Sequence, residues 1–263
     1  MTGKAKKPLE FELTDELRGA RFTRLDLEGA RFRDVNFRNV KIADSDLTGA
    51  SLWGAIDGLR INGVEVAPLI KTELDRQLPE RARMRVDDPD SVRDTWDLIE
   101  ELWSATVARA RRLPEGALHE RVDEEWSFVE TLRHLVFVTD AWVSRTILGE
   151  QRPYHPIGLW TIEAPGELEA RNRVLVGMGL DVDATPTLDD VLAARAERMA
   201  VVREILEKLT VKEFGRSCAV KPDSGPPGPP KVPVRGCLTI VIGEEYMHYR
   251  YAIRDLAVLE SAR

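Results

Sequence analysis

The sequence predicts a mainly α-helical protein in which a four-helix bundle follows a short repetitive segment. Four long segments carry apolar residues at helical spacing, and the N-terminal part repeats every five residues. We divide the 263 residues into an N-terminal segment of residues 1–70 and a helical domain of residues 71–263. The division follows an Asn-Gly turn at residues 62–63, after which the composition becomes rich in Glu and Arg.

The N-terminal segment has an apolar residue at every fifth position, and small or apolar residues two positions before most of these. The fifth-position residues are Leu17, Phe22, Leu27, Phe32, Phe37, Ile42, Leu47 and Leu52. This period matches neither a helix nor a strand. The pattern resembles the pentapeptide-repeat family, whose chains form a short right-handed, four-sided (quadrilateral) β-helix with the fifth-position side chains pointing inward. The resemblance covers about residues 11–60.

The charge of the repeats argues against DNA mimicry, which some pentapeptide-repeat proteins show. Between Glu16 and Leu52 there are seven basic and six acidic residues, so no acidic field results. We expect a structural cap or an interaction surface. Because eight repeats form only about two turns of such a solenoid, we also expect the segment to dock on the rest of the chain.

The first long helix is predicted over residues 91–112, where apolar residues recur every three or four positions and therefore form one apolar face of a helix. Pro114 ends the segment. A second helix begins at the capping box of Ser127 and Glu130 and runs to Gly149. His134 therefore lies on its second turn. A third helix is predicted over residues 187–209.

The last helix is predicted over residues 235–259, and four long helices imply a bundle. The connection from Glu150 to Pro186 is long. The proline-rich stretch 222–233 is expected to lack regular structure and to act as a spacer or lid.

Composition limits the classes of function. A net charge of −7 with a pI near 5.3 argues against binding to nucleic acid. No apolar run of about 20 residues and no secretory leader occurs, so we expect a cytoplasmic protein with no membrane partner. Cys218 and Cys237 lack the spacing of a zinc knuckle and are expected to be ordinary thiols.

Two segments carry the residues for a metal site. In the last helix, Glu244 and His248 are four residues apart and therefore share one helical face. His134 in the second helix would complete a set of two imidazoles and one carboxylate, which leaves a coordination position open as in catalytic zinc sites. Glu245 is a rival to Glu244, because it lies three residues from His248.

The segments around these residues, Trp126 to Leu135 and Glu244 to Leu256, resemble the DinB-like family, which is also described with the mycothiol-dependent maleylpyruvate isomerases. The resemblance implies a DinB-like four-helix bundle over about residues 90–258 in a bacterial protein. It also implies a divalent metal, zinc or nickel, with His134, Glu244 and His248 as ligands. Many members have His-x-x-x-His in the last helix, and glutamate at position 244 matches the thiol-dependent isomerase branch.

The resemblance further implies a low-molecular-weight thiol, mycothiol or bacillithiol, as co-substrate, with S-transfer or isomerisation as the chemistry. The isomerase branch has an additional C-terminal domain, and this sequence ends at Arg263, so we expect S-transfer. Tyr154 and His155 lie in a proline-bounded loop and are predicted to contact the substrate. The alternative is a noncatalytic metal-binding or protein-interaction scaffold. A homodimer is a further expectation.

Overall fold

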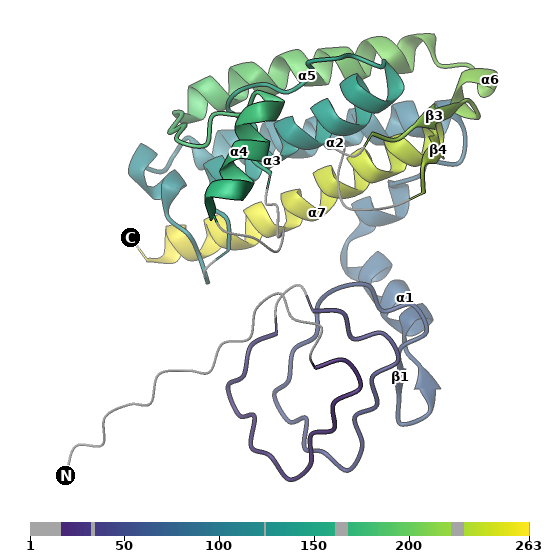
Figure 1. Cartoon of the computed structure of the whole chain (residues 1–263), viewed down its shortest axis with the longest axis vertical. Helices are drawn as coiled ribbons and strands as arrows, with labels where there is room; N and C mark the ends of the chain where they lie inside the picture. Colours follow the sequence, from purple (N-terminus) through teal and green to yellow (C-terminus); the bar gives the residue numbers. More distant parts are fainter. Residues whose placement is uncertain (1–16, 33–34, 124, 161–167, 222–228, 263) are drawn as a thin grey trace. The chain divides into compact units, whose positions relative to one another are not determined.

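The computed structural model describes residues 17–32, 35–123, 125–160, 168–221 and 229–262. The chain divides into two compact units, Met1–Thr72 and Glu73–Arg263 (Figure 1). The five-residue repeats lie in the first unit and the long helices in the second.

The backbone of the first unit turns at intervals of ten residues. At each turn an amide donates a hydrogen bond to a carbonyl three residues earlier, as from Ala20 to Leu17 (3.0 Å) and from Ala30 to Leu27 (2.9 Å). Residues 17–32 and 35–59 contain no strand, so the β-helix stays a prediction. The fifth-position side chains are exposed, from 42% for Leu17 to 64% for Leu52, and their expected burial is not found. Two coils leave each row of side chains with few neighbouring rows to pack against.

A hairpin follows the repeats, as the Asn-Gly pair predicts. Strand β1 (Arg60–Ile61) pairs antiparallel with β2 (Val64–Glu65). Both turn residues have positive φ, 50° at Asn62 and 82° at Gly63, which is the requirement of a type I′ turn. The helix that comes next, α1 (Ala67–Gln77), was not predicted.

Four long helices form the second unit, close to the predicted bounds. They are α2 (Pro89–Ala110), α3 (Phe128–Thr139), α5 (Leu188–Lys208) and α7 (Val234–Ser261). Helix α2 packs on α7, and α3 packs on both α5 and α7. Figure 1 shows the four with their long axes running alongside one another. The predicted mainly helical fold is confirmed.

Side-chain caps fix where three of these helices begin. Asp88 and Ser91 form a capping box at α2, and Thr187 and Asp190 form one at α5. The predicted box at α3 is present: the Glu130 amide donates to Ser127 Oγ (3.2 Å), and the Ser127 amide donates to the Glu130 carboxylate (2.9 Å). Each box satisfies amides that the first helical turn leaves without partners.

The second predicted helix has the expected length, but it changes from α-helical to π-helical hydrogen bonding part-way along. After Thr139 the chain continues as a π-helical segment, η3 (Asp140–Ile147). The Leu148 amide there donates to the carbonyl of Val143, five residues earlier (3.0 Å). The wider turn rotates the following side chains relative to those of α3.

Two predicted connections contain regular structure. Between Glu150 and Pro186 the chain forms α4 (Leu168–Met178), which Figure 1 shows running across the long helices. In the proline-rich stretch, β4 (Lys231–Pro233) pairs with β3 (Ser217–Ala219), so the expectation of no regular structure is wrong at its end. Residues 222–228 of that stretch lie outside the described residues. Short edge strands tolerate proline because one side of the strand needs no ladder partner.

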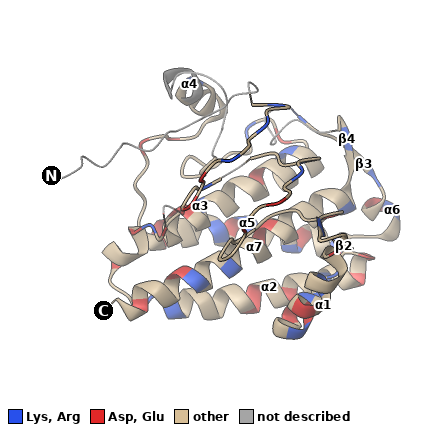
Figure 2. Ribbon diagram, turned by 90° about the horizontal axis from the view of Figure 1, so that it is seen from below, with Lys and Arg blue, Asp and Glu red and all other residues tan. Residues whose placement is uncertain are grey.

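Short helical turns complete the second unit: η1 (Pro79–Arg83), η2 (Glu115–His119) and α6 (Val211–Phe214). The core lies between the long helices and includes fully buried Trp96, Ile99, Leu132, Leu135, Leu238 and Leu256. Acidic and basic residues are interspersed along the helices in Figure 2. None of the described helices has the length and apolar character that crossing a bilayer requires.

The capping box of α3 predicts a measurable loss of stability when it is broken. Ser127→Ala removes the oxygen that accepts from the Glu130 amide, so the free energy of unfolding should fall by about 1 kcal/mol in urea denaturation. Ser104→Ala, on the exposed face of α2, is the matched control and should change little. Equal stability of Ser127→Ala and the parent chain would contradict a role for the cap.

Candidate metal centre

Helices α3 and α7 bring together the three predicted ligands. His134 comes from the second turn of α3, and Glu244 and His248 come from adjacent turns of α7. One ligand atom from each residue lies within 4.8 Å of the other two. Within the described residues this is the one group of three or more His, Cys, Asp or Glu side chains with such spacing. We refer to these residues as the triad.

The carboxylate of Glu244 lies between the two imidazoles. Its Oε2 atom is 3.5 Å from His134 Nε2 and 3.4 Å from His248 Nδ1. The histidine side chains are each 13% exposed, whereas that of Glu244 is 38% exposed. The triad is therefore walled by protein on the histidine side and reachable from solvent beside the carboxylate.

A backbone carbonyl orients His134. Its Nδ1 lies 3.2 Å from the oxygen of Leu159, and since a carbonyl only accepts, the ring proton resides on Nδ1. Nε2 faces the Glu244 carboxylate and is the atom that would bind a metal. The Leu159 amide donates in turn to the carbonyl of Arg133 (3.1 Å), so the loop is tied to α3 on both sides of the imidazole. Such outer contacts typically fix the ring of a ligating histidine.

Aromatic rings cover the histidines. The Trp126 ring centroid lies 4.6 Å from that of His134 and 5.8 Å from that of His248, to which it is nearly parallel. The Tyr251 ring meets His248 edge-on at 5.8 Å. These contacts restrict the rotation of both imidazoles and remove water from their faces.

Burial and mutual charge set the protonation of the triad. Burial, followed by the neighbouring His134, lowers the pKa of His248 to about 4. Burial would raise the pKa of Glu244, but the hydrogen bond from His134 and the attraction to both imidazoles bring that pKa below its usual value. At neutral pH His248 is therefore uncharged and Glu244 ionised, which are the forms that bind metals.

Two family models match parts of the chain. A family model described as the DinB superfamily matches residues 98–252, more than half of the chain. The chain belongs to the DinB superfamily. A second model, pentapeptide repeats in eight copies, matches residues 16–54. No curated protein and no solved structure matches the chain.

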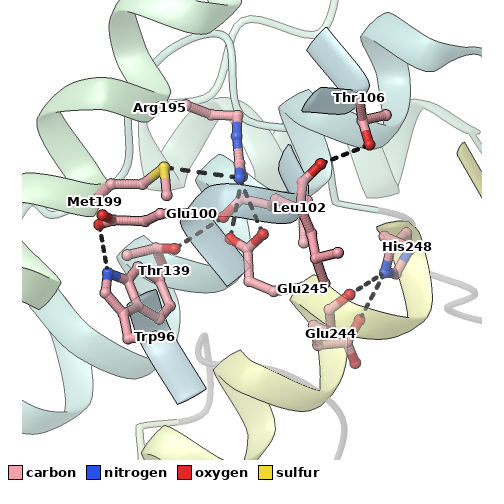
Figure 3. A network of polar contacts seen from close by, with 11 residues as sticks. Trp96, Glu100, Leu102, Thr106, Thr139, Arg195, Met199, Glu244, Glu245 and His248 are labelled. Carbon is pink, nitrogen blue, oxygen red and sulfur yellow. Dashed lines mark hydrogen bonds and ion pairs between the residues drawn. The ribbon is translucent and has the colours of Figure 1, made fainter. Parts of the chain in front are cut away.

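In this DinB-superfamily bundle, Glu245 points away from the triad. Its carboxylate accepts two hydrogen bonds from Arg195 of α5, at 3.1 and 2.9 Å. The side chains are 1% and 5% exposed, so this is a buried ion pair. Figure 3 shows Glu245 directed at Arg195, while Glu244 faces His248. The guanidinium also lies 5.1 Å from the centre of the Trp103 ring.

The two predicted substrate-binding residues have other contacts. Tyr154 is buried and stacks on Phe137 with ring centroids 5.3 Å apart. The backbone amide of His155 donates to Oδ2 of Asp140 (2.8 Å), at the start of η3. Both residues thus help to fix the loop on the bundle. Substrate contact by either one stays a prediction.

Sequence reasoning assigned no role to several residues around the triad. The Leu159 carbonyl has no sequence signal, because any residue supplies one. Trp126 does have a signal: an aromatic residue directly before the capping box of the helix that carries His134. The sequence signal for Arg195 is weak: it is a charged residue at a core-facing position of α5, and such a residue requires a buried partner.

Glu245→Gln should destabilise the fold strongly, because it leaves the Arg195 cation buried without its counter-charge. We expect the free energy of unfolding in urea to fall by about 3 kcal/mol. Glu101→Gln, at an exposed position of α2, is the matched control and should have little effect. The double change Arg195→Met with Glu245→Leu should recover part of the loss. A Glu245→Gln protein as stable as the parent would disprove the role of the pair.

Asp140 predicts a pH dependence of stability. It is 1% exposed, and burial raises its pKa from 3.8 to about 6 despite hydrogen bonds from His155 and Arg198. Since the folded state keeps this proton to higher pH than the unfolded state, the contribution of Asp140 falls as the pH rises from about 4 to about 6. Asp140→Asn should lack this fall in urea denaturation across that range. The same pH slope in both proteins would refute the assignment.

Proposed function

We propose that this DinB-superfamily protein is a metal-dependent enzyme acting on a low-molecular-weight thiol, with S-transfer as the expected chemistry and isomerisation as the related possibility. The observation that carries the proposal is the convergence of His134, Glu244 and His248 from two helices, with ligand atoms within 4.8 Å of one another. The triad would hold one divalent ion.

The donor set suits zinc or nickel. Imidazole nitrogen and carboxylate oxygen are common ligands of zinc, and imidazole also suits nickel. His248 is neutral and Glu244 is ionised, which are the forms that bind a metal, and the Leu159 carbonyl orients the ring of His134. Three protein ligands leave room for a further one, which is the arrangement of catalytic rather than closed structural sites.

The charge of the triad favours an anionic reactant. The two imidazoles are neutral ligands and the carboxylate contributes one negative charge, so a divalent ion held there would keep net positive charge. Bound at such a site, a divalent ion lowers the pKa of a thiol and makes the thiolate available at neutral pH. Trp126 and Tyr251 shield the histidines from water, which strengthens charge interactions at the site.

Single substitutions of the three predicted ligand residues test the metal site. Protein purified without a histidine tag should retain about one zinc or nickel ion per chain in elemental analysis. His134→Ala, His248→Ala and Glu244→Gln should lose most of it, while circular dichroism of Glu244→Gln stays that of the parent, because this carboxylate is partly exposed.

The adjacent Glu245 provides the matched control for ligand identity. Glu245→Gln should keep its metal at temperatures where it remains folded, since its carboxylate faces Arg195. Loss of metal in Glu245→Gln together with retention in Glu244→Gln would show that the ligand assignment is wrong by one residue.

A thiol should be detectable at the metal directly. Addition of mycothiol or bacillithiol to the cobalt-substituted protein should produce a sulfur-to-cobalt charge-transfer band, because a coordinating thiol is deprotonated. If cobalt occupies the site and neither thiol changes the spectrum at millimolar concentration, thiol chemistry is ruled out as the function of the site.

The alternative is a noncatalytic metal-binding or protein-interaction scaffold. The observation that favours it is the exposed apolar side chains of the repeats, such as Phe22 at 61% and Trp53 at 69%. A chain that is purified without metal and is indifferent to the histidine changes would support the scaffold.

A further inference from the structure

The repeats of the first unit carry a dense set of exposed apolar side chains. Within residues 17–53 the structure leaves twelve large apolar side chains between 42% and 69% exposed. We call them the repeat surface, and they are Leu17, Phe22, Leu25, Leu27, Phe32, Val35, Phe37, Val40, Ile42, Leu47, Leu52 and Trp53. Single exposed apolar residues are normal, but apolar patches larger than a few hundred Å² mark interaction sites. The repeat surface is therefore a candidate interface.

Two neighbouring fifth-position side chains turn toward each other inside the coil. Phe32 and Phe37, from consecutive repeats, meet edge to face with their ring centroids 5.4 Å apart. Figure 1 shows the backbone of this unit running round in angular coils. Side chains that meet inside a coil and are still about half exposed face its open end, because a further coil would cover them. The repeat surface thus has the shape that another coil fills.

The backbone of the repeats is available for pairing as well. Between the described residues of the repeats, backbone hydrogen bonds join residues three apart at the turns. Examples are the Val40 amide, which donates to the Phe37 carbonyl (3.2 Å), and the Ala50 amide, which donates to that of Leu47 (3.0 Å). Extended edges without ladder partners are templates for pairing with another chain. An added coil would therefore satisfy backbone groups and cover apolar side chains together.

Charge favours a second copy of this chain as the occupant. Residues 16–52 hold seven basic and six acidic residues, so their net charge is +1. The whole chain carries −7, which leaves −8 on the residues outside the repeats. Two copies that met through their helical domains would repel each other, whereas two repeat segments approach without this repulsion. A strongly acidic or basic partner, by contrast, finds no complementary charge on the repeats.

The exposed area is of the size that a dimer needs. The first four repeats contribute six members of the repeat surface, between residues 17 and 35, at 42% to 61% exposure. Since a large aromatic side chain measures about 150–250 Å², these six present roughly 600 Å² of apolar area. Each partner of a stable complex buries about 800 Å² in all. The small residues and the backbone edge of the same coil supply the remainder.

We propose that this protein forms a twofold homodimer in which the repeat surfaces of two copies stack end to end. The same five-residue period on both copies lets each apolar side chain meet a counterpart, which is the self-complementarity that a twofold interface requires. The dimer does not depend on the proposed metal site, because the triad lies in the second unit and the repeat surface in the first.

Sedimentation equilibrium of the full chain measures the dimer directly. The double change Phe22→Ala with Phe32→Ala should raise the dimer dissociation constant about hundredfold, because a twofold interface loses each ring twice. Val174→Ala with Val211→Ala, which shortens two exposed apolar side chains of the helical domain, is the matched control and should leave the constant unchanged. His134→Ala should dimerise as the parent chain does, even though it loses its metal.

Amide hydrogen exchange of the unsubstituted chain locates the interface without any change of sequence, so the test stands even if the double variant fails to fold its repeats. Amides of residues 17–59 should exchange more slowly at protein concentrations above the dissociation constant than below it. Exchange in the four long helices should be the same at both concentrations.

Three results would overturn the dimer: a parent chain that is monomeric at every concentration, an unchanged dissociation constant in the double variant, or concentration-dependent protection confined to the helical domain. A monomer whose free energy of unfolding falls in the double variant would also overturn it, and would show that the chain's own helical domain covers the repeats. Metal analysis decides the proposed function separately, so either proposal can fail while the other stands.

Discussion

Glu244 and Glu245 are consecutive residues of α7, and their side chains leave the helix about 100° apart. One faces the two histidines, and the other is buried against Arg195 of α5. Both arrangements require the same rotation of α7 about its axis. A buried ion pair adds little net stability relative to apolar packing, but an unpaired buried charge is very unfavourable. The pair therefore disfavours any rotation of α7 that would move Glu244 and His248 away from His134.

A second constraint comes from the loop after η3. Arg133 donates through Nε to the carbonyl of Ile157 (2.8 Å) and through Nη1 to that of Ala184 (3.0 Å), while its neighbour His134 contacts the carbonyl of Leu159. Adjacent residues of α3 thus anchor the segments before and after α4 and contact the ring of a candidate ligand. At the start of η3, Asp140 receives the amide of His155 and the guanidinium of Arg198. The predicted substrate loop is held by these contacts, and its tyrosine contributes to an apolar cluster with Phe137.

Much of the helical domain follows from local physical chemistry. Apolar residues at helical spacing gave four helices that the structure confirms, and the capping box at Ser127 located the start of α3 to the residue. The change to π-helical winding, the short α4 and the strand that ends at Pro233 were missed. Their sequences have weak or contrary local preferences, so these elements depend on packing and hydrogen bonds to distant parts of the chain. The repeat pattern predicted regular turns but not the exposure of its apolar side chains.

The sequence by itself determined the family and the three residues of the triad, because the motif places Glu244 and His248 one turn apart and His134 near a helix start. Spacing did not distinguish Glu244 from Glu245, since both lie within one turn of His248. The family motif favoured Glu244, and only the tertiary structure gives the physical reason: the Glu245 carboxylate is paired with Arg195, fifty residues earlier in the chain. Local sequence specifies helical faces, whereas the partner of each face is fixed by packing between segments far apart in the chain.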